Sequence, residues 1–222
     1  MTNELDPSSL AQQIRRFHDG LRGRVPDEIV AILSRELERL AQSGIDQRSL
    51  QAGSGAPDFA LPDQSGEIVR LSKLLERGPA VVTFYRGGWC PYCNLQLRAY
   101  QAVLPDIAAR GATLVAISPQ TPDFTLSTVQ EKGLGFPVLS DGGNHVARRY
   151  GLVFVLSEAL QELQKKFGNE VPRFNGDDSW ELPMPGTFIV SKDGIVRLAS
   201  VDSDYRRRLE PAAILDCLAN LS

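Results

Sequence analysis

Cysteine and histidine are scarce in this chain of 222 residues, which holds three of the first and two of the second. A structural zinc site draws its ligands mostly from these residue types, at fixed spacings. Cys90 and Cys93 are close enough to share a metal, but Cys217, His18 and His145 lie far from them and from one another. The sequence therefore predicts no metal site, and no motif in it predicts a cofactor.

Long apolar runs and an excess of positive charge are also absent. No stretch approaches the roughly 18 apolar residues that a membrane-spanning helix needs. The chain has 24 Lys and Arg against 27 Asp and Glu, a net charge of −3. These features argue against a membrane protein and against binding of nucleic acid. Residues 1–6 are polar and acidic, unlike a secretory leader. Paired cysteines without a leader suit a reducing compartment, so we expect a cytoplasmic protein.

The segment Cys90-Pro91-Tyr92-Cys93 is the most informative feature that is present. It follows an apolar, β-branched run at 80–85, which predicts a buried strand, and it precedes apolar residues at helical spacing. Proline suits the first helical position, so we expect Cys90 at the N-cap and Cys93 in the first turn. The positive end of a helix dipole favours a thiolate there. The pattern predicts a redox-active dithiol, whereas Cys217 is expected in the core.

The first 50 residues predict a helical extension. Residues 7 to about 44 carry apolar side chains at helical spacing in two segments, with Gly20 and Gly23 ending the first and Gly44 the second. A linker rich in glycine and serine follows, so we divide the chain into an extension (1–50) and a main domain (51–222). We expect the two helices to pack on the main domain; a subunit interface, and hence a homodimer, is the alternative.

Beyond the linker, strand patterns alternate with helix patterns. Strands are expected at 68–71, 80–85, 113–118 and 136–141, and helices from Pro91 through Ile107, near 122–132 and at 146–150. Residues 154–182 are expected to form a mostly helical insertion. A hairpin of 187–190 with 195–198 and a helix from Pro211 complete the chain. The alternation predicts an α/β fold, a mixed sheet flanked by helices.

Several segments together resemble a known family. They are residues 56–63, 84–93, 136–141 and 146–152. On these motifs, residues 55–221 resemble the peroxiredoxin (AhpC/TSA) family, in a branch that carries a CxxC motif. The resemblance implies a thioredoxin-like sheet of the peroxiredoxin type. It also implies a thiol-dependent peroxidase that reduces hydrogen peroxide or organic hydroperoxides through Cys90 and Cys93. A thioredoxin-like or glutaredoxin-like reductant would then restore the dithiol.

The sequence departs from this family at the positions that handle peroxide. The family places a proline, a threonine and the peroxidatic cysteine in one loop, and an arginine on a later strand. The resemblance puts Cys93 at the peroxidatic cysteine and Cys90 at the threonine. Arg86 then stands at the proline, and Pro185 at the arginine. Thioredoxins have a cis-proline at that last position, so the Met184–Pro185 bond is expected to be cis and close to the dithiol.

These departures leave the substrate open. The resemblance favours a peroxidase, whereas the missing threonine and arginine, with Pro185 present, favour a protein dithiol–disulfide oxidoreductase or redox sensor. A non-catalytic thioredoxin-fold module is the third alternative. The attacking cysteine is open as well. The N-cap position favours Cys90, as the more exposed end of the loop, for disulfide exchange, and the family pattern favours Cys93 for peroxide.

The residues around the dithiol have alternative roles too. Arg86 could supply positive charge beside a thiolate, with backbone N–H groups of the first turn, or it could be a solvated loop charge. Trp89 and Tyr92 could dock a partner protein or pack the loop. His18 has no visible partner in the sequence, and the basic run 206–208 is expected to form a solvated face.

Overall fold

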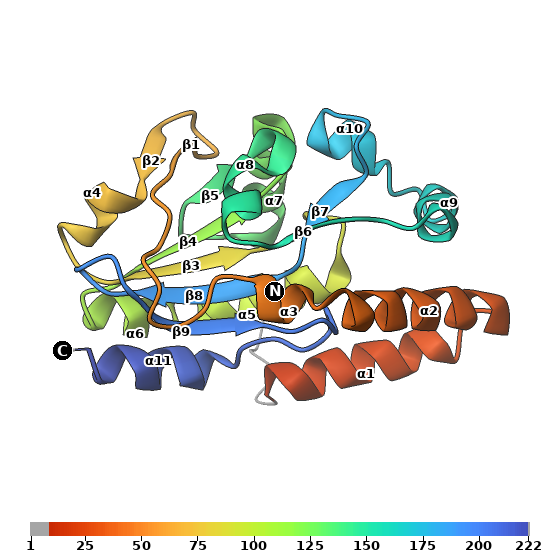
Figure 1. Ribbon diagram of the computed structural model, residues 1–222, viewed down its shortest axis with the longest axis horizontal. Helices are drawn as coiled ribbons and strands as arrows, with labels where there is room; N and C mark the ends of the chain where they lie inside the picture. The colour runs from red at the N-terminus through yellow and green to blue at the C-terminus, as the bar shows by residue number, and fades with distance from the viewer. Residues whose placement is uncertain (1–8, 222) are drawn as a thin grey trace.

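The computed structural model describes residues 9–221, and a five-stranded sheet lies at its centre (Figure 1). The strand order is β5-β4-β3-β8-β9. The strands β3 (Ala80–Phe84), β4 (Thr113–Ser118) and β5 (Val138–Ser140) run parallel to one another. The hairpin of β8 (Gly186–Val190) and β9 (Val196–Val201) adds antiparallel to β3. This mixed sheet confirms the predicted α/β fold class.

Helices cover both faces of the sheet (Figure 1). One face carries α5 (Pro91–Ala102), α6 (Leu104–Ala109) and α11 (Pro211–Ala219), and the other carries α7 (Pro122–Lys132) and α8 (His145–Arg149). Every residue of β3 and β8 is buried, because both strands have a neighbour on either side and helices above and below. The dithiol, at the start of α5, therefore lies next to the fully buried central strands of the sheet.

The prediction of one continuous helix from Pro91 through Ile107 is wrong. The chain breaks at Val103, where α5 has ended and α6 is about to begin. Pro105 has no N–H to donate to the carbonyl of Gln101, and its ring crowds that carbonyl. The apolar spacing in the sequence continues through Pro105, but the helical hydrogen bonds are interrupted there, so the spacing alone predicted too long a helix.

The N-terminal extension is helical, as predicted. It comprises α1 (Leu10–Arg22), α2 (Asp27–Ser43) and the single turn α3 (Ile45–Arg48). A capping box of Ser9 and Gln12 begins α1, and Gly44, in the left-handed region at a φ of 64°, ends α2. The helix α1 packs against α5, and α2 packs against α9 (Glu158–Lys166). The predictions that concerned residues 1–8 lie outside the described residues.

The insertion at 154–182 is bounded by a short strand pair. The strands β6 (Val153–Val155) and β7 (Glu181–Pro183) pair antiparallel and enclose α9 and α10 (Val171–Asn175). The other elements outside the central sheet are β1 (Ala60–Pro62), β2 (Ile68–Arg70), α4 (Leu71–Leu75) and a 3-10 turn, η1 (Gly142–Asn144). The division of the chain at residue 50 stays a prediction.

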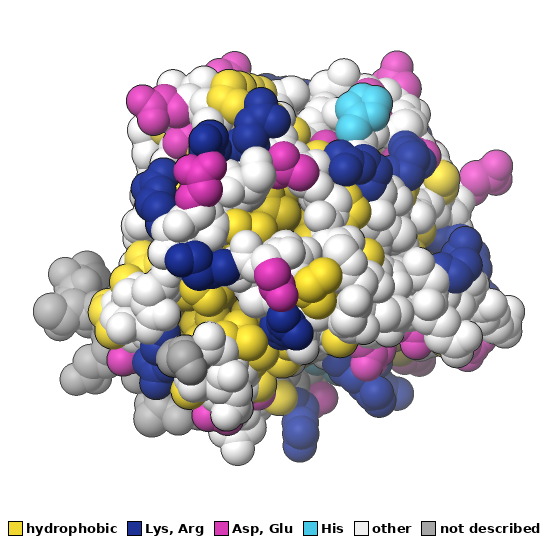
Figure 2. All heavy atoms as spheres, turned by 60° about the vertical axis from the view of Figure 1, so that its left-hand side comes forward, with side chains coloured by type: hydrophobic (Ala, Val, Ile, Leu, Met, Phe, Trp, Pro, Cys, Tyr) yellow, Lys and Arg dark blue, Asp and Glu magenta, His cyan; other side chains and the backbone are white. Residues whose placement is uncertain are grey.

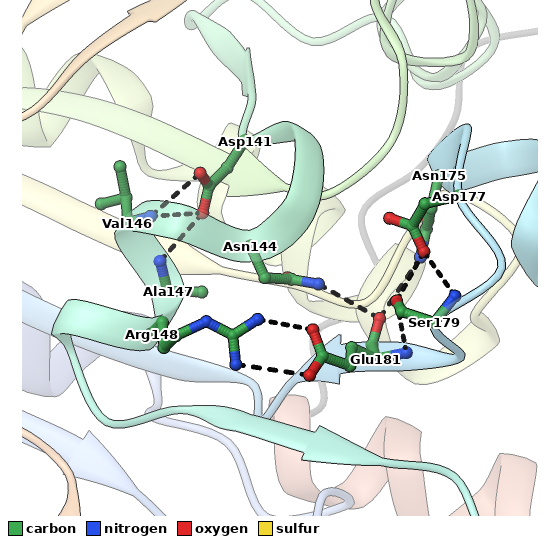
Figure 3. Close-up of polar contacts among 9 residues, drawn as sticks. All are labelled: Asp141, Asn144, Val146, Ala147, Arg148, Asn175, Asp177, Ser179 and Glu181. Carbon is green, nitrogen blue, oxygen red and sulfur yellow. Dashed lines mark hydrogen bonds and ion pairs between the residues drawn. The ribbon is translucent and has the colours of Figure 1, made fainter.

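Polar contacts join α8 to this insertion (Figure 3). The Asp141 carboxylate accepts hydrogen bonds from the backbone N–H groups of Val146, at 3.0 Å, and Ala147, at 2.9 Å. On the same helix, Arg148 forms an ion pair of 2.5 Å with Glu181 of β7. Asp141 thus satisfies two of the free donors at the start of α8.

Replacing Asp141 by alanine is expected to lower the free energy of unfolding by about 1–2 kcal/mol, the usual cost of losing such a cap. Urea denaturation followed by circular dichroism measures this. Asp178→Ala, an exposed carboxylate of the insertion, is the matched control and should stay within about 0.5 kcal/mol of the wild type. Equal midpoints for the two variants would show that the Asp141 contacts contribute nothing.

Candidate active site

The dithiol lies where β3 gives way to α5, as predicted. Cys90 is the N-cap of α5 and Pro91 its first residue, which puts Cys93 in the first turn. Gly87 shapes the loop before them: it has a φ of +147°, and a Cβ there would meet Trp89 Nε1 at 2.4 Å. Only glycine fits this turn without displacing the tryptophan.

Both sulfur-bearing side chains are fully buried, and this corrects one prediction. Cys90 and Cys93 each have an exposed fraction of 0%. We expected Cys90 to be the more exposed end of the loop. Arg86, which stacks on Tyr205, contacts its sulfur, and Phe17 of α1 packs against Tyr92 in the same turn.

Arg86 contacts the sulfur of Cys90 and is not a solvated loop charge. Its Nη2 donates to Cys90 Sγ at 3.0 Å, and the side chain is only 5% exposed. The guanidinium lies 4.2 Å from the ring centroid of Tyr205 and 5.6 Å from that of Trp89. Cation–π contacts of this kind are strongest where water is excluded. They hold a positive charge beside the dithiol.

A second arginine, Arg208, contacts Cys93, and no local pattern in the sequence predicts this contact. Its Nη1 and Nη2 lie 3.8 and 3.7 Å from Cys93 Sγ. The same guanidinium donates to Gln96 Oε1 and, through Nε, to the carbonyl of Tyr205 at 2.6 Å. The prediction that 206–208 forms a solvated face is wrong for Arg208. The chain leaves β9 here and returns through α11 to the sheet face that carries α5, and this topology brings the segment over the cysteines.

The two thiols have opposite pKa shifts. Burial raises the pKa of Cys90 well above its usual value, and the hydrogen bond with Cys93 raises it further, against the charge of Arg86. Burial also opposes ionisation of Cys93. However, the hydrogen bond from Cys90 and the charges of Arg208 and Arg86 bring the pKa of Cys93 well below its usual value. The directions of the two pKa shifts favour ionisation of Cys93 before Cys90.

Tyr92 packs against the N-terminal extension and presents little surface to a partner. It is 6% exposed, and its ring meets Phe17 of α1 edge to face at a centroid distance of 5.2 Å. Its hydroxyl lies 3.2 Å from His18 Nδ1, so His18 has a partner after all. His18 Nε2 in turn contacts Arg206 Nη1 at 3.0 Å. Tyr92 could dock a partner protein only if α1 moved away from it.

Trp89, the other aromatic residue beside the dithiol, is half-buried.

The prediction of a cis Met184–Pro185 bond is wrong. No cis peptide bond occurs between residues 9 and 221. Pro185 is buried and directly precedes Gly186, which pairs with Phe84 at the end of β3. The chain runs from β7 almost straight into β8, and such an extended path suits the trans form, which X-Pro bonds favour by about 0.5–1 kcal/mol.

Cys217 is half-buried on α11, not fully enclosed as expected. Burial raises the pKa of its thiol. It packs against the edge of the core, while the adjacent Leu218 fills the interior position. Nothing groups it with the dithiol at the start of α5.

Within the part of the chain that the structure describes, no three His, Cys, Asp or Glu side chains form a group able to hold a metal ion.

Across the same residues, no helix combines the length and apolar character that crossing a bilayer requires. On the face shown in Figure 2, side chains of both charges are interspersed around small apolar areas.

About two thirds of the chain matches one protein family. Residues 52–199 match the model of the AhpC/TSA family. The chain belongs to this family. The matched stretch includes both cysteines of the dithiol and Arg86, but it excludes α1, α2 and Arg208.

Individual relatives include both peroxidases and disulfide oxidoreductases. Peroxiredoxin Q, chloroplastic, of Sedum lineare is 29% identical over 164 residues, 74% of this chain and 73% of the relative. The thiol-disulfide oxidoreductase ResA of Bacillus anthracis is 24% identical over 166 residues, 74% of this chain and 78% of the relative. The family member described here is a thiol-dependent peroxidase or oxidoreductase.

Solved structures agree with the thioredoxin-like fold. Peroxidoxin BcpB from Mycobacterium tuberculosis superposes with a TM-score of 0.62 at 23% identity, over 78% of this chain and 99% of that one. Peroxiredoxin Q of Xanthomonas campestris superposes with a TM-score of 0.54 at 20% identity, over 73% and 89%. These confirm the predicted fold of the peroxiredoxin type.

Proposed function

We propose that this protein reduces hydrogen peroxide or small organic hydroperoxides, with Cys93 as the nucleophile and Cys90 as the resolving thiol. The observation that carries this proposal is the complete burial of both cysteines. A peroxide needs far less room at an enclosed sulfur than a protein substrate does. A protein disulfide must bring its own backbone up to the sulfur, and the burial of both sulfurs, with Arg86 in contact with Cys90, obstructs this.

The chemistry runs in two steps that conserve atoms and electrons. The Cys93 thiolate attacks one peroxide oxygen, the O–O bond breaks, and the second oxygen takes a proton from solvent and leaves as water or an alcohol. Cys93 becomes a sulfenic acid. Cys90 then attacks the oxidised sulfur, and the hydroxyl leaves as water with the thiol proton. Because Cys93 has lost its negative charge by then, the charge of Arg86 favours ionisation of Cys90, 3.0 Å away.

A dithiol reductant closes the cycle. A thioredoxin-like or glutaredoxin-like protein supplies two electrons by thiol–disulfide exchange and leaves Cys90 and Cys93 reduced. This exchange requires that a sulfur become accessible in the oxidised state. A cytoplasmic location fits such a cycle, and it stays a prediction together with the homodimer.

The second candidate function is oxidation or reduction of protein disulfides without peroxide. The similarity to ResA, which is named as a thiol-disulfide oxidoreductase, favours it. The same two cysteines would serve, and the substrate alone would differ.

We expect one equivalent of hydrogen peroxide to remove two thiols from the reduced protein and to form a Cys90–Cys93 disulfide, leaving Cys217 free. Thiol titration followed by peptide mapping of the alkylated protein measures this. The Cys217→Ser variant should behave as the wild type, which controls for the third thiol. The outcome that contradicts the proposal is a protein whose thiols resist hydrogen peroxide but are oxidised by a protein disulfide such as oxidised insulin.

A further inference from the structure

We propose that α1 controls access to the turn that carries the dithiol, and that it stays closed over this turn only while His18 is neutral. Protonation of His18 releases the second half of α1 and opens the turn to the protein dithiol that reduces the enzyme. The identity of this partner rests on the proposed function. The motion itself depends only on the contacts of α1 with α5, α2 and the segment 202–210.

Two consecutive residues of α1 cover the side chain that stands between the two cysteines. Tyr92 follows Cys90 and precedes Cys93 in the chain, and it is only 6% exposed. The ring of Phe17 meets the ring of Tyr92 edge to face, at a centroid distance of 5.2 Å. His18 Nδ1 lies 3.2 Å from the Tyr92 hydroxyl. A protein partner of the dithiol needs the surface that these two residues of α1 occupy.

The second polar contact of His18 defines its protonation state. Arg206 Nη1 lies 3.0 Å from His18 Nε2. A guanidinium can only donate, so Nε2 is the acceptor, and the imidazole proton is on Nδ1, which donates to the Tyr92 hydroxyl. A protonated imidazole carries a hydrogen on Nε2 as well, which would face the N–H of Arg206 with no acceptor between them. The closed position of α1 therefore requires neutral His18.

Arg206 is held in the orientation that meets His18. Its Nε and Nη2 each donate to the carboxylate of Asp204, at 2.8 Å. These two bonds fix the plane of the guanidinium, so that Nη1 remains directed at α1. The arginine therefore keeps a donor against His18 whether or not the imidazole can accept it.

The charges closest to His18 favour the neutral form. Burial and then the charge of Arg206 lower the pKa of His18, and Arg22 acts in the same direction. Asp19 and Asp204 act in the opposite direction, but they do not reverse the shift. Asp204 is itself engaged in the ion pair with Arg206. A proton on His18 is thus disfavoured as long as α1 is closed.

The other groups that face His18 add no compensating negative field. Burial raises the pKa of Tyr92, on α5, to about 12, and it also raises the pKa of Tyr205, so both hydroxyls stay uncharged. An open cavity of about 490 Å³ beside His18 is lined by further charged side chains, which are mostly basic: Arg15, Arg207, Arg208 and Glu210.

The two halves of α1 are attached differently. In the first half, Leu10 and Ile14 are buried, and Glu210 accepts hydrogen bonds from the N-terminal N–H groups of the helix. The second half borders a cavity of about 200 Å³, which uncharged side chains of α2 such as Leu33 and Leu37 line from the other side. This space lets the second half move while the first half stays attached.

The direction of the pH effect follows from these contacts. In the displaced position, His18 has the ordinary histidine pKa of about 6.5, whereas in the closed position its pKa is lowered. Above about pH 6.5, His18 is neutral in both positions, and α1 is closed. As the pH falls below this value, the displaced form binds a proton first. Its population therefore rises until the pH has passed the lowered pKa of the closed form.

The test measures how fast reduced thioredoxin reduces the oxidised protein at about pH 7.5 and at about pH 5.5, on either side of the ordinary pKa of histidine. The Cys90–Cys93 disulfide is formed with diamide in the Cys217→Ser background, so no peroxide is needed. Dithiothreitol serves as the small reductant for comparison. Hydrogen exchange of α1, followed by mass spectrometry, reports the motion directly.

Three variants isolate the proton on His18. His18→Gln is the neutral reference, because its amide can accept from Arg206 and donate to Tyr92 at either pH. Each rate is divided by the rate of His18→Gln at the same pH, which cancels the pH dependence of the thiols themselves. His18→Lys carries a permanent charge. His145→Gln is the matched control, since His145 is the other histidine of the chain and is exposed on α8.

The rate ratio of the wild type with thioredoxin should be close to one at the higher pH. It should rise about 10-fold at the lower pH, the effect of losing one hydrogen bond to a charged group. His18→Lys should be fast at both pH values, and His145→Gln should follow the wild type. Dithiothreitol should show a smaller rise. Hydrogen exchange should increase at the lower pH, most in the second half of α1.

A rate ratio that stays constant between the two pH values would overturn the inference. Equal hydrogen exchange of α1 in the wild type and His18→Gln at the lower pH would overturn it too. The wild type and His18→Gln decide the question even if His18→Lys does not fold. If the wild type does not consume peroxide but the ratio rises, the proposed function is wrong and α1 controls disulfide exchange alone. A constant ratio in an active peroxidase has the opposite meaning, so the two failures are distinguishable.

Discussion

Replacing Cys93 by serine is expected to abolish peroxide reduction, with a rate loss of more than about 10³-fold, because removal of a nucleophile removes most of the catalysis. Cys90→Ser should behave differently. With Cys93 intact, it should consume one equivalent of hydrogen peroxide and then stop as a sulfenic acid, since its resolving thiol is gone. Stopped-flow kinetics with trapping of the sulfenic acid by dimedone distinguishes the two variants.

The pH dependence gives a second readout of the same prediction. The thiolate is the reactive form, and the pKa of Cys93 is lowered. Its reaction with peroxide should therefore persist as the pH falls below about 8.5, where a free cysteine protonates, and decline only when the pH falls through the lowered value. If Cys93→Ser reacts as fast as the wild type, the roles of the two cysteines are reversed.

Arg86→Met is expected to slow formation of the disulfide by about 10²–10³-fold, the usual cost of removing one preorganised donor. The reason is its contact with Cys90 Sγ at 3.0 Å, in a site where both groups are buried. The first step should be affected less, so the sulfenic acid on Cys93 should accumulate. Quenched samples taken during a single turnover measure both species.

Arg86→Lys should be intermediate, because a lysine keeps the charge but loses the planar stacking on Tyr205. Arg110→Met, a half-buried arginine at the end of α6, is the control and should form the disulfide at the wild-type rate. A normal rate of disulfide formation in Arg86→Met would show that Cys90 does not depend on this charge.

Local patterns in the sequence were sufficient for the central part of the site. The β-branched run before Cys90 and the proline after it predict a strand, a turn and a helix, and the structure has them in that order. Arg86 was within reach for the same reason, since it lies four residues before Cys90. The burial of Arg86 could not be predicted in this way, because it depends on Tyr205, which is distant in the sequence and stacks on the guanidinium.

Contacts between distant segments were beyond the sequence. Arg208 is separated from Cys93 by 115 residues, and His18 from Tyr92 by 74. No periodicity links such pairs, and only the return of the chain through α11 brings the first pair together. The break at Val103 is a different case, because Pro105 was a visible local signal that the apolar spacing outweighed.

The hydrogen bonds that attach α1 limit how far this enzyme can be truncated. Glu210, two residues beyond Arg208, accepts hydrogen bonds from the backbone N–H groups of Leu10, at 3.0 Å, and Ala11, at 2.8 Å. A fragment limited to residues 52–199 would keep both cysteines and Arg86. It would lose α1, the segment that contains Tyr205 and Arg208, and the hydrogen bonds of Glu210 that join the two. The smallest unit able to enclose the dithiol is therefore longer than the family domain, because Phe17 of α1 packs on Tyr92 and Tyr205 stacks on Arg86.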